Sequence, residues 1–427
     1  MEEKLLINGG RPLEGKVKVD ASKNAFLPIL AASTLCDGEI NLKNFCPLSD
    51  LFAMKDILEE LNIKTKISGE EIYIDTRLIQ NNSIGFSLTK RLRASIFLLG
   101  PLLSRFGYAK IAKPGGCNIG LRPIDQYVKG FKTLGAEVEE DDEFYICKAK
   151  KLHSGEINLD FPSVGATESL MMCATLIEGR TKIKNSAKEP EIVDLQNFLN
   201  QMGAKVFGAG TDEILIDGVK RLHGTEYSVM PDRIIAGTYI LACAIAHGDI
   251  LVENAKFEHS EMLFKLLSQT ACQIKIFDDK IRVISRERLS SIKNICTKPY
   301  PGFPTDLQPQ MMALQVVSKG QSQIVENIFE NRLSHTEEFL KMGANISVCG
   351  NVATITGVET LTGTEVCAPD LRAGAGLILA GLVSDGQTTL SGLNFVDRGY
   401  YKIEEKLSML GADIKRIKIE QKVDNCH

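Results

Sequence analysis

The sequence lacks the cysteine and histidine patterns of metal and disulfide proteins. Its 11 cysteines are scattered without a CxxC pair, and its 6 histidines form no HxxxH or HExxH arrangement. Closely spaced ligands of these types hold structural zinc, and paired cysteines in a short secreted chain form disulfide frameworks. We therefore expect no metal site, no disulfide framework and a reducing compartment.

A strong charge of one sign and long apolar runs are also absent. The formal net charge is -4 over 427 residues, without a basic stripe, so we expect no nucleic-acid or membrane-surface partner. The longest apolar run, residues 234–246, is too short to span a bilayer and predicts a buried core helix. The start, MEEKLLINGG, lacks the pattern of a secretory signal. We expect a cytoplasmic monomer with two or three domains.

One glycine-rich segment stands out. Residues 113–123, KPGGCNIGLRP, place Cys117 between Lys113 and Arg122. Glycines open backbone conformations that other residues avoid, and neighbouring cations favour a thiolate or an anionic ligand. The alternative is a flexible surface loop with an incidental cysteine. The loop by itself does not decide between these interpretations.

A pattern of an alanine-rich run, a glycine and a short alternating segment recurs along the chain. Its glycines are Gly38, Gly107, Gly179, Gly248, Gly320 and Gly386. The period is roughly 70 residues, and each copy predicts a buried helix, a glycine C-cap and a strand. A second helix ends at a Leu/Met-Gly-Ala signal, clear at Gly135, Gly203, Gly343 and Gly411, and a hairpin-like stretch follows. An α/β fold of duplicated units follows, although duplication by itself carries no function.

Cations stand near the predicted starts of several alanine-rich helices, namely Lys23, Arg93, Arg233 and Arg372. A positive charge there costs roughly 0.3 to 1 kcal/mol unless an anion binds. We predict that these starts converge on one or two sites for a ligand with several phosphates or carboxylates. For a single pair such as Asp232 and Arg233, an ordinary helix cap beside a surface cation is the alternative.

Motifs spread over the whole chain carry a resemblance to a known family. They are ASKNA (21–25), RLRAS (91–95), PGGCNIGLRPIDQ (114–126), PSVGATE (162–168), EPEIVD (189–194), PGFPTDLQPQ (301–310), FENR (329–332), DLRAG (370–374) and DRGY (397–400). In their order and spacing the chain resembles the UDP-N-acetylglucosamine 1-carboxyvinyltransferases of the enolpyruvyl transferase family. Two departures are Phe161, where some members have lysine, and the Leu333-Ser334 pair after FENR.

The resemblance implies a two-domain inside-out α/β barrel with six repeats, three in each domain. One domain, residues 22–231, carries the Cys117 loop. The other combines residues 1–21 with residues 232–427. The active site is expected in a cleft between the domains that closes over the substrates.

The resemblance also implies an activity. The enolpyruvyl group of phosphoenolpyruvate moves to the 3'-hydroxyl of UDP-N-acetylglucosamine, and phosphate leaves, as the first committed step of peptidoglycan synthesis. No metal or organic cofactor takes part. The catalytic residues carried over are Cys117, Asp306, Lys23 and Arg398. The substrate-binding residues are Lys23, Asn24, Arg93, Arg122, Pro123, Ile124, Asp125, Gln126, Ser163, Val164, Gly165, Asp306, Ile328, Arg332, Asp370, Arg372 and Arg398.

Cys117 is the implied acid that protonates the substrate at C3, and Asp306 the implied base for the sugar hydroxyl. Because Asp306 stands near a predicted helix start, an N-cap role is its alternative. At the level of function, the alternatives are 3-phosphoshikimate 1-carboxyvinyltransferase and a non-catalytic UDP-N-acetylglucosamine-binding protein. The first resembles the chain less, because its lysine is followed by serines rather than by Asn24 and it lacks the PGGC loop. No GxGxxG motif supports a dinucleotide enzyme.

Overall fold

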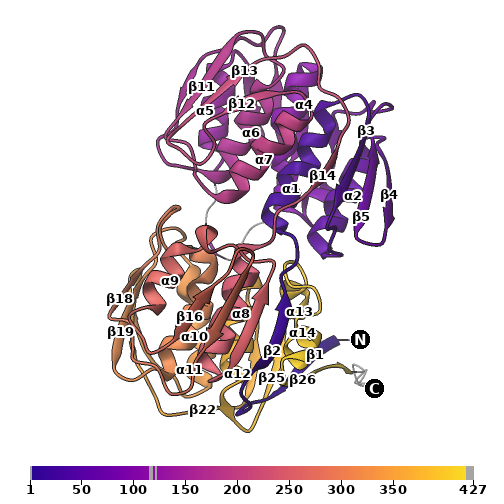
Figure 1. Ribbon diagram of the computed structural model, residues 1–427. Helices are drawn as coiled ribbons and strands as arrows, with labels where there is room; N and C mark the ends of the chain where they lie inside the picture. Colours follow the sequence, from indigo (N-terminus) through magenta and orange to yellow (C-terminus); the bar gives the residue numbers. More distant parts are fainter. Residues whose placement is uncertain (1, 115–118, 121–122, 420–427) are drawn as a thin grey trace, which may run out of the picture. The chain divides into compact units, whose positions relative to one another are not determined.

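The computed structural model describes residues 2–114, 119–120 and 123–419 (Figure 1). The chain forms two compact units. The N-terminal unit comprises Ala21–Cys117 and Arg122–Pro231, and the C-terminal unit comprises Met1–Asp20 and Asp232–His427, with Ile119 and Gly120. Ala21, expected in the C-terminal unit, lies in the N-terminal unit because it forms a β-bridge with Pro231.

Six four-stranded sheets of the described residues share one pairing order. In each sheet the first strand is parallel to the second. The second and third strands are antiparallel to each other, and so are the third and fourth. In the N-terminal unit the sheets, in pairing order, are β14 (Glu226–Ser228), β3 (Glu39–Lys43), β5 (Glu71–Asp75) and β4 (Lys64–Ser68); β6 (Ser83–Ile84), β7 (Tyr108–Ala112), β9 (Phe144–Lys148) and β8 (Glu137–Glu140); and β10 (Glu156–Asn158), β11 (Arg180–Lys184), β13 (Glu213–Asp217) and β12 (Lys205–Phe207).

Residues from the start of the chain complete two sheets of the C-terminal unit. In β1, Leu5 lies opposite Leu390 on one side and Arg416 on the other. The sheets, in pairing order, are β2 (Glu14–Lys18), β15 (Asp249–Glu253), β17 (Lys280–Ile284) and β16 (Gln273–Ile276); β18 (Asn294–Cys296), β19 (Gln321–Val325), β21 (Val352–Thr356) and β20 (Asn345–Cys349); and β23 (Glu365–Cys367), β25 (Gln387–Ser391), β1 (Glu2–Asn8) and β26 (Asp413–Ile419). The short strands β22 (Leu361–Thr362) and β24 (Ser384–Asp385) form a further parallel pair.

The helices connect these strands. Those of the N-terminal unit are α1 (Lys23–Ala32), η1 (Ser33–Leu35), α2 (Ser49–Glu60), α3 (Phe86–Thr89), η2 (Arg93–Leu98), α4 (Leu99–Phe106), α5 (Asp125–Thr133), α6 (Val164–Ala174) and α7 (Pro190–Gln201), where η marks a 3₁₀ helix. Those of the C-terminal unit are α8 (Arg233–Ile245), η3 (Phe257–His259), α9 (Glu261–Leu267), η4 (Thr305–Leu307), α10 (Gln308–Val317), η5 (Arg332–His335), α11 (Thr336–Lys341), α12 (Leu371–Gly381), α13 (Leu393–Val396) and α14 (Ile403–Met409).

Three helices form the centre of the C-terminal unit. α8, α10 and α12 pack against one another, with the strands outside them (Figure 1). From Ile234 to Ile245, every residue of α8 is buried, as the apolar run predicted. A helix buried on all sides needs small residues where backbones approach. At Gly376 of α12, an added Cβ would lie 2.7 Å from the carbonyl oxygen of Pro309 in α10, so glycine is required there.

The local signals were mostly confirmed. A strand follows each of the six predicted glycines, and the glycines of the Leu/Met-Gly-Ala signals have the positive φ of a helix C-terminus. The prediction that each of the six glycines is a helix C-cap was wrong, because among them only Gly107 caps its helix directly. At Gly248 the left-handed conformation belongs to the preceding His247, with φ 56°.

None of the helices in the described part of the chain reaches the length and apolarity needed to cross a bilayer.

Candidate active site

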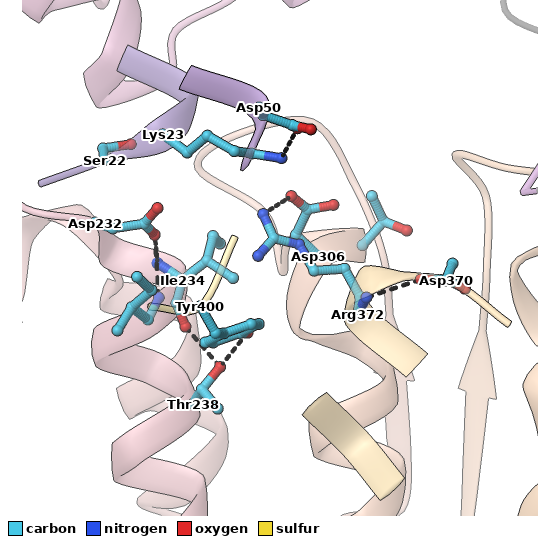
Figure 2. Close-up of polar contacts among 12 residues, drawn as sticks. Ser22, Lys23, Asp50, Asp232, Ile234, Thr238, Asp306, Asp370, Arg372 and Tyr400 are labelled. Carbon is cyan, nitrogen blue, oxygen red and sulfur yellow. Dashed lines mark hydrogen bonds and ion pairs between the residues drawn. The ribbon is translucent and has the colours of Figure 1, made fainter. Parts of the chain in front are cut away.

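Lys23 is the first residue of α1 and is buried. Ser22 caps the helix, since its Oγ accepts a hydrogen bond of 3.3 Å from the backbone N–H of Ala25. The Lys23 Nζ lies 2.9 Å from Oδ2 of Asp50 in the first turn of α2 (Figure 2). A lysine at a helix N-terminus is therefore stabilised by a carboxylate of the same unit, and an anionic ligand of Lys23 would meet a preformed ion pair.

Asn24 and Arg93 lie on elements that pack together. Asn24 is the second residue of α1 and is half-buried. Arg93 begins η2, which contacts α1, and its guanidinium lowers the pKa of nearby Tyr145, although burial raises that pKa more. The predicted helix start near Arg93 is confirmed, although the helix begins as a 3₁₀ helix and becomes α-helical at Leu99.

A second group of predicted residues meets at the start of α5 and α6. The Gln126 side chain donates to Asp160 Oδ2 at 3.2 Å and accepts from the Asp160 backbone N–H at 2.9 Å. Ser163 caps α6, because its Oγ accepts from the N–H of Ala166 at 3.4 Å. At Gly165 an added Cβ would lie 1.9 Å from the hydroxyl of Tyr127, so this position requires glycine.

The other residues of this group differ in exposure. Ile124 is buried, Val164 is half-buried, and Pro123 and Asp125 are exposed. The predicted Cys117 and Arg122 lie outside the described residues.

Asp306 is the centre of the group in the C-terminal unit. It lies in η4, and both of its carboxylate oxygens accept from arginines. Oδ2 accepts from Arg372 Nη2 at 2.7 Å (Figure 2), and Oδ1 accepts from Arg332 Nη2 at 3.0 Å. The arginine side chains are only 2% and 5% exposed. Neither η4 nor α10 has a side-chain cap hydrogen bond. The alternative of an N-cap role for Asp306 was therefore wrong.

Asp370 and Arg332 fix this group from the other side. Asp370 caps α12, because its Oδ1 accepts from the backbone N–H groups of Arg372 at 2.8 Å and Ala373 at 3.1 Å. The same oxygen lies 3.3 Å from Arg332 Nη1. The Arg332 guanidinium also donates from Nε to Thr305 Oγ1 at 3.3 Å. Two buried arginines, two half-buried aspartates and the start of α12 thus form one charge network.

Ile328 joins the group through Glu326, which the sequence analysis did not single out. The Glu326 side chain accepts from the backbone N–H of Ile328 at 2.8 Å and from Thr305 Oγ1 at 3.0 Å. Glu326 is only 3% exposed, so its carboxylate depends on these donors. It holds the Ile328 segment against the turn that carries Asp306.

Arg398 lies on the segment that follows α13 and is half-buried. Two residues later, Tyr400 is 1% exposed, and its hydroxyl oxygen lies 2.8 Å from Thr238 Oγ1 in α8. Burial raises the pKa of Tyr400, and the neighbouring Arg372 opposes that rise. The pKa of Arg372 is raised even though burial would lower it, because Asp306, Tyr400 and Asp232 surround the guanidinium.

The cations at helix starts need a revised interpretation. Within each unit they have protein partners: Lys23 has Asp50, Arg372 has Asp306, and the Arg233 guanidinium lies 5.6 Å from the ring centre of Tyr300. Asp232 caps α8 through Oδ1, with 2.8 Å to the N–H of Ile234, as its simpler alternative predicted. A bound anion is therefore not required to stabilise these cations, although it could exchange with the carboxylates.

Several buried ionisable residues in the neighbourhood escaped the sequence analysis. Asp50, Glu326 and His335 carry no motif signal of their own, although Glu326 and His335 flank FENR. His335 Nδ1 lies 2.6 Å from the Arg332 carbonyl oxygen, so the ring donates there. Burial is the main cause that lowers the pKa of His335 to about 4. Its neutral ring supports the backbone of Arg332.

Glu168 in α6 is a further buried acid of the N-terminal unit. It is 1% exposed, and neither carboxylate oxygen has a hydrogen-bond partner among the described residues. Burial, with contributions from Glu191 and Glu189, raises its pKa well above the ordinary value. The site therefore favours a protonated, neutral Glu168.

Comparisons with known proteins connect this geometry to a family. The family model for EPSP synthase (3-phosphoshikimate 1-carboxyvinyltransferase) matches residues 7–407. UDP-N-acetylglucosamine 1-carboxyvinyltransferase 2 of Caldanaerobacter subterraneus subsp. tengcongensis is 48% identical over 414 residues, covering 97% of this chain and 99% of that protein. UDP-N-acetylglucosamine 1-carboxyvinyltransferase of Finegoldia magna is 49% identical over 412 residues, covering 96% and 97%. The chain belongs to the UDP-N-acetylglucosamine 1-carboxyvinyltransferase family.

Solved structures show the same fold at lower identity. The enolpyruvyl transferase NikO from Streptomyces tendae has a TM-score of 0.88 at 23% identity, covering 98% of this chain and all, 100%, of that one. EPSP synthase from Acinetobacter baumannii has a TM-score of 0.75 at 17% identity, with the same coverage. The α/β fold of this family of transferases is thereby shown for the chain.

Proposed function

We propose that this protein transfers the enolpyruvyl group of phosphoenolpyruvate to the 3'-hydroxyl of UDP-N-acetylglucosamine and releases phosphate, in the first committed step of peptidoglycan synthesis. The observation that carries the proposal is the cluster in which the buried side chains of Arg332 and Arg372 both bind the half-buried Asp306. It combines two fixed guanidinium groups for an anionic substrate with a carboxylate for a hydroxyl proton. Membership of the family supplies the substrates.

The proposed reaction is an addition followed by an elimination. Cys117 donates a proton to C3 of phosphoenolpyruvate, and C2 gains oxocarbenium character. The sugar hydroxyl adds to C2 while Asp306 accepts its proton, which gives a tetrahedral phospholactyl ketal. Loss of a proton from C3 and of phosphate from C2 then restores the double bond. The Cys117 thiolate can also add to C2 as a covalent adduct.

Cations stabilise the negative charge of the reacting groups in this scheme. Arg332 and Arg372 bind the carboxylate, Arg122 and Arg398 bind the phosphate that leaves, and Lys23 and Asn24 contact phosphoenolpyruvate. Because Arg332 and Arg372 already sit on a carboxylate, they are held at the separation that a carboxylate ligand needs. The substrate carboxylate would share or replace Asp306 as their partner.

The remaining predicted residues are proposed to bind the UDP-sugar. This set comprises Arg93, Pro123, Ile124, Asp125, Gln126, Ser163, Val164, Gly165, Asp306 and Ile328, with Asp370 holding the arginines. The hydrogen bonds between Gln126 and Asp160 support a common wall from the starts of α5 and α6. Phe161 stands where some members of the family have lysine, and it is 48% exposed. Its ring would contribute an apolar contact to the UDP-sugar.

The finer expectations about architecture and setting belong to the same proposal. The shared pairing order of the four-stranded sheets supports six copies of one unit, three around each set of buried helices, as an inside-out barrel in each domain. The reaction uses residues from both units. We propose a cytoplasmic monomer that needs no metal or organic cofactor.

Two alternatives remain for the test. The matching family model carries the name of the sister enzyme that uses shikimate 3-phosphate, but the relatives at 48% and 49% identity carry the UDP-N-acetylglucosamine name. A non-catalytic binding protein would not need an aspartate held between two buried arginines, since apolar residues of similar volume can replace a buried charge network without loss of stability.

The deciding experiment measures phosphate release from phosphoenolpyruvate alone, with UDP-N-acetylglucosamine, and with shikimate 3-phosphate. We expect release only with the UDP-sugar. Release without an acceptor, or with shikimate 3-phosphate instead, would overturn the assignment. Binding of the UDP-sugar without any release would establish the non-catalytic alternative.

A further inference from the structure

A buried chain of polar side chains lies beneath Arg372 in the C-terminal unit. The Tyr400 hydroxyl oxygen and Thr238 Oγ1 are 2.8 Å apart (Figure 2). The Gln310 Nε2 of α10 lies 3.1 Å from each of these two oxygens. Gln310, Thr238 and Tyr400 are 0%, 1% and 1% exposed. Each of these three residues comes from a different element. Their hydrogen bonds therefore join two central helices, α8 and α10, to the segment that carries Arg398.

Counting the hydrogens assigns a direction to the hydrogen bonds. The Thr238 hydroxyl donates to the carbonyl oxygen of Ile234 at 2.8 Å, which uses its single proton. Gln310 Nε2 can only donate. Between Thr238 and Tyr400, the Tyr400 hydroxyl must therefore be the donor, and Thr238 Oγ1 the acceptor.

This direction fixes the orientation of the Tyr400 hydroxyl. Its proton points to Thr238, so the lone pairs of its oxygen face Gln310 and the Arg372 guanidinium. The hydrogen bond with Arg372 and the positive charge of that residue both lower the pKa of Tyr400, in agreement with an oxygen that accepts from the arginine. Arg372 is thus held by Asp306 on one side and by the Tyr400 oxygen on another.

We infer that Tyr400, with its proton anchored by Thr238, is a positioning residue that aims Arg372 at the carboxylate of phosphoenolpyruvate. The inference rests on the proposed function of Arg372. Without the Tyr400 oxygen, only the charges of Asp306 and Asp232 would direct the guanidinium, and Asp306 is also the group that would share or exchange its partners when substrate binds. The tyrosine is the neutral partner that keeps Arg372 in place during that exchange.

The test compares steady-state kinetics of Tyr400→Phe, Thr238→Val and Thr238→Ser with those of the unaltered protein. We expect Tyr400→Phe to raise KM for phosphoenolpyruvate about tenfold, the usual scale for one hydrogen bond to a charged group, and KM for UDP-N-acetylglucosamine less than about twofold. Thr238→Val should act in the same direction, and Thr238→Ser, which keeps the hydroxyl, should restore most of the loss.

A double variant separates positioning from general damage to the fold. If Thr238 acts through Tyr400, adding Thr238→Val to Tyr400→Phe should change KM for phosphoenolpyruvate little further. Tyr227→Phe is the matched control, because the Tyr227 hydroxyl donates to Asp194 at 2.7 Å within the N-terminal unit, whereas Arg372 belongs to the C-terminal unit. It should leave KM for phosphoenolpyruvate within about twofold.

The outcomes distinguish the inference from the proposed function. An unaltered protein that releases no phosphate with both substrates would overturn the proposed function itself. An active protein whose KM for phosphoenolpyruvate is unchanged in Tyr400→Phe would overturn the inference alone. Equal rises in both KM values with a lower melting temperature, or additive effects in the double variant, would also overturn it, because they indicate a purely structural role.

Discussion

Arg372 and Asp306 are joined by a contact of 2.7 Å between Nη2 and Oδ2. The other oxygen of the same carboxylate contacts Arg332, so Asp306 neutralises two nearly buried guanidinium groups at once. Removing one partner from a buried charge network costs more than the network contributes, because the remaining charges stay desolvated. This relationship makes Asp306 a stability determinant as well as the proposed base.

We predict that Asp306→Ala abolishes turnover and destabilises the C-terminal unit by about 3 kcal/mol. The variant leaves Arg332 and Arg372 with one fewer carboxylate. Thermal unfolding should show a lower melting temperature, and added phosphoenolpyruvate or inorganic phosphate should recover part of the loss by binding the two guanidinium groups in place of the missing carboxylate. An unchanged melting temperature would show that the pair contributes nothing to stability.

Arg372→Lys should raise KM for phosphoenolpyruvate by about tenfold or more, although the charge is kept. A lysine ammonium has one nitrogen, so it cannot donate to Asp306 and to the Tyr400 oxygen through separate nitrogens of a planar group. Arg77→Lys is the control, because Arg77 forms an exposed pair with Asp75 at 2.8 Å. Similar kinetics for the two variants would contradict a directed role for the guanidinium.

For Cys117, we predict that Cys117→Ala abolishes turnover, whereas Cys117→Asp, which keeps a titratable proton, retains some. Full activity of the alanine variant would exclude the acid role. Intact-mass measurement after treatment with fosfomycin should show one adduct that is absent from Cys117→Ala. Buried thiols should not react, since burial raises the pKa of Cys147 and of Cys243 to about 12.

We predict that Glu168 makes the folded protein less stable as pH rises. Its pKa is raised in the folded protein, so above the ordinary value of 4.5 the fold binds a proton that the unfolded chain has released. The contribution of Glu168 to folding stability is therefore fully present below pH 4.5, and it is lost as pH rises through the pKa of the folded protein. Glu168→Gln, which is always neutral, should match the unaltered protein near pH 4 and melt at least ~2 °C higher at pH 8. Equal melting temperatures at both pH values would mean that Glu168 is not held neutral.

We predict that His335 has the opposite effect and makes the folded protein less stable as pH falls. Its pKa is lowered from 6.5 to about 4, so below pH 6.5 the unfolded chain binds a proton that the fold does not. Stability is full above 6.5 and falls as pH drops, by about 3 kcal/mol near pH 4. His335→Gln keeps a donor for the Arg332 carbonyl and removes the titration. Denaturant unfolding at pH 7.5 and pH 4.5 should show a smaller loss for the variant, and an equal loss would refute the effect.

Local sequence patterns predicted much of the secondary structure. The glycine after each alanine-rich run marked the strand that follows it, and the Leu/Met-Gly-Ala signals marked helix ends where a positive φ is needed. These features depend on neighbours in the chain, which a single sequence displays. The exact caps were less accurate, as at His247, because a turn can place its left-handed residue at either of two positions.

The family could be recognised from the sequence, because motifs of chemically specific residues occur in order along the whole chain. The pairing of charges could not be read from the sequence and is seen only in the fold. It paired Lys23 with Asp50, placed Asp306 between Arg332 and Arg372, and put the Tyr400 hydroxyl beneath Arg372. Sequence separation does not report such contacts, because they depend on how helix starts from distant segments pack in one core. The energies of buried charges follow from that packing, since a cation out of water is stable only where folding brings an anion to it.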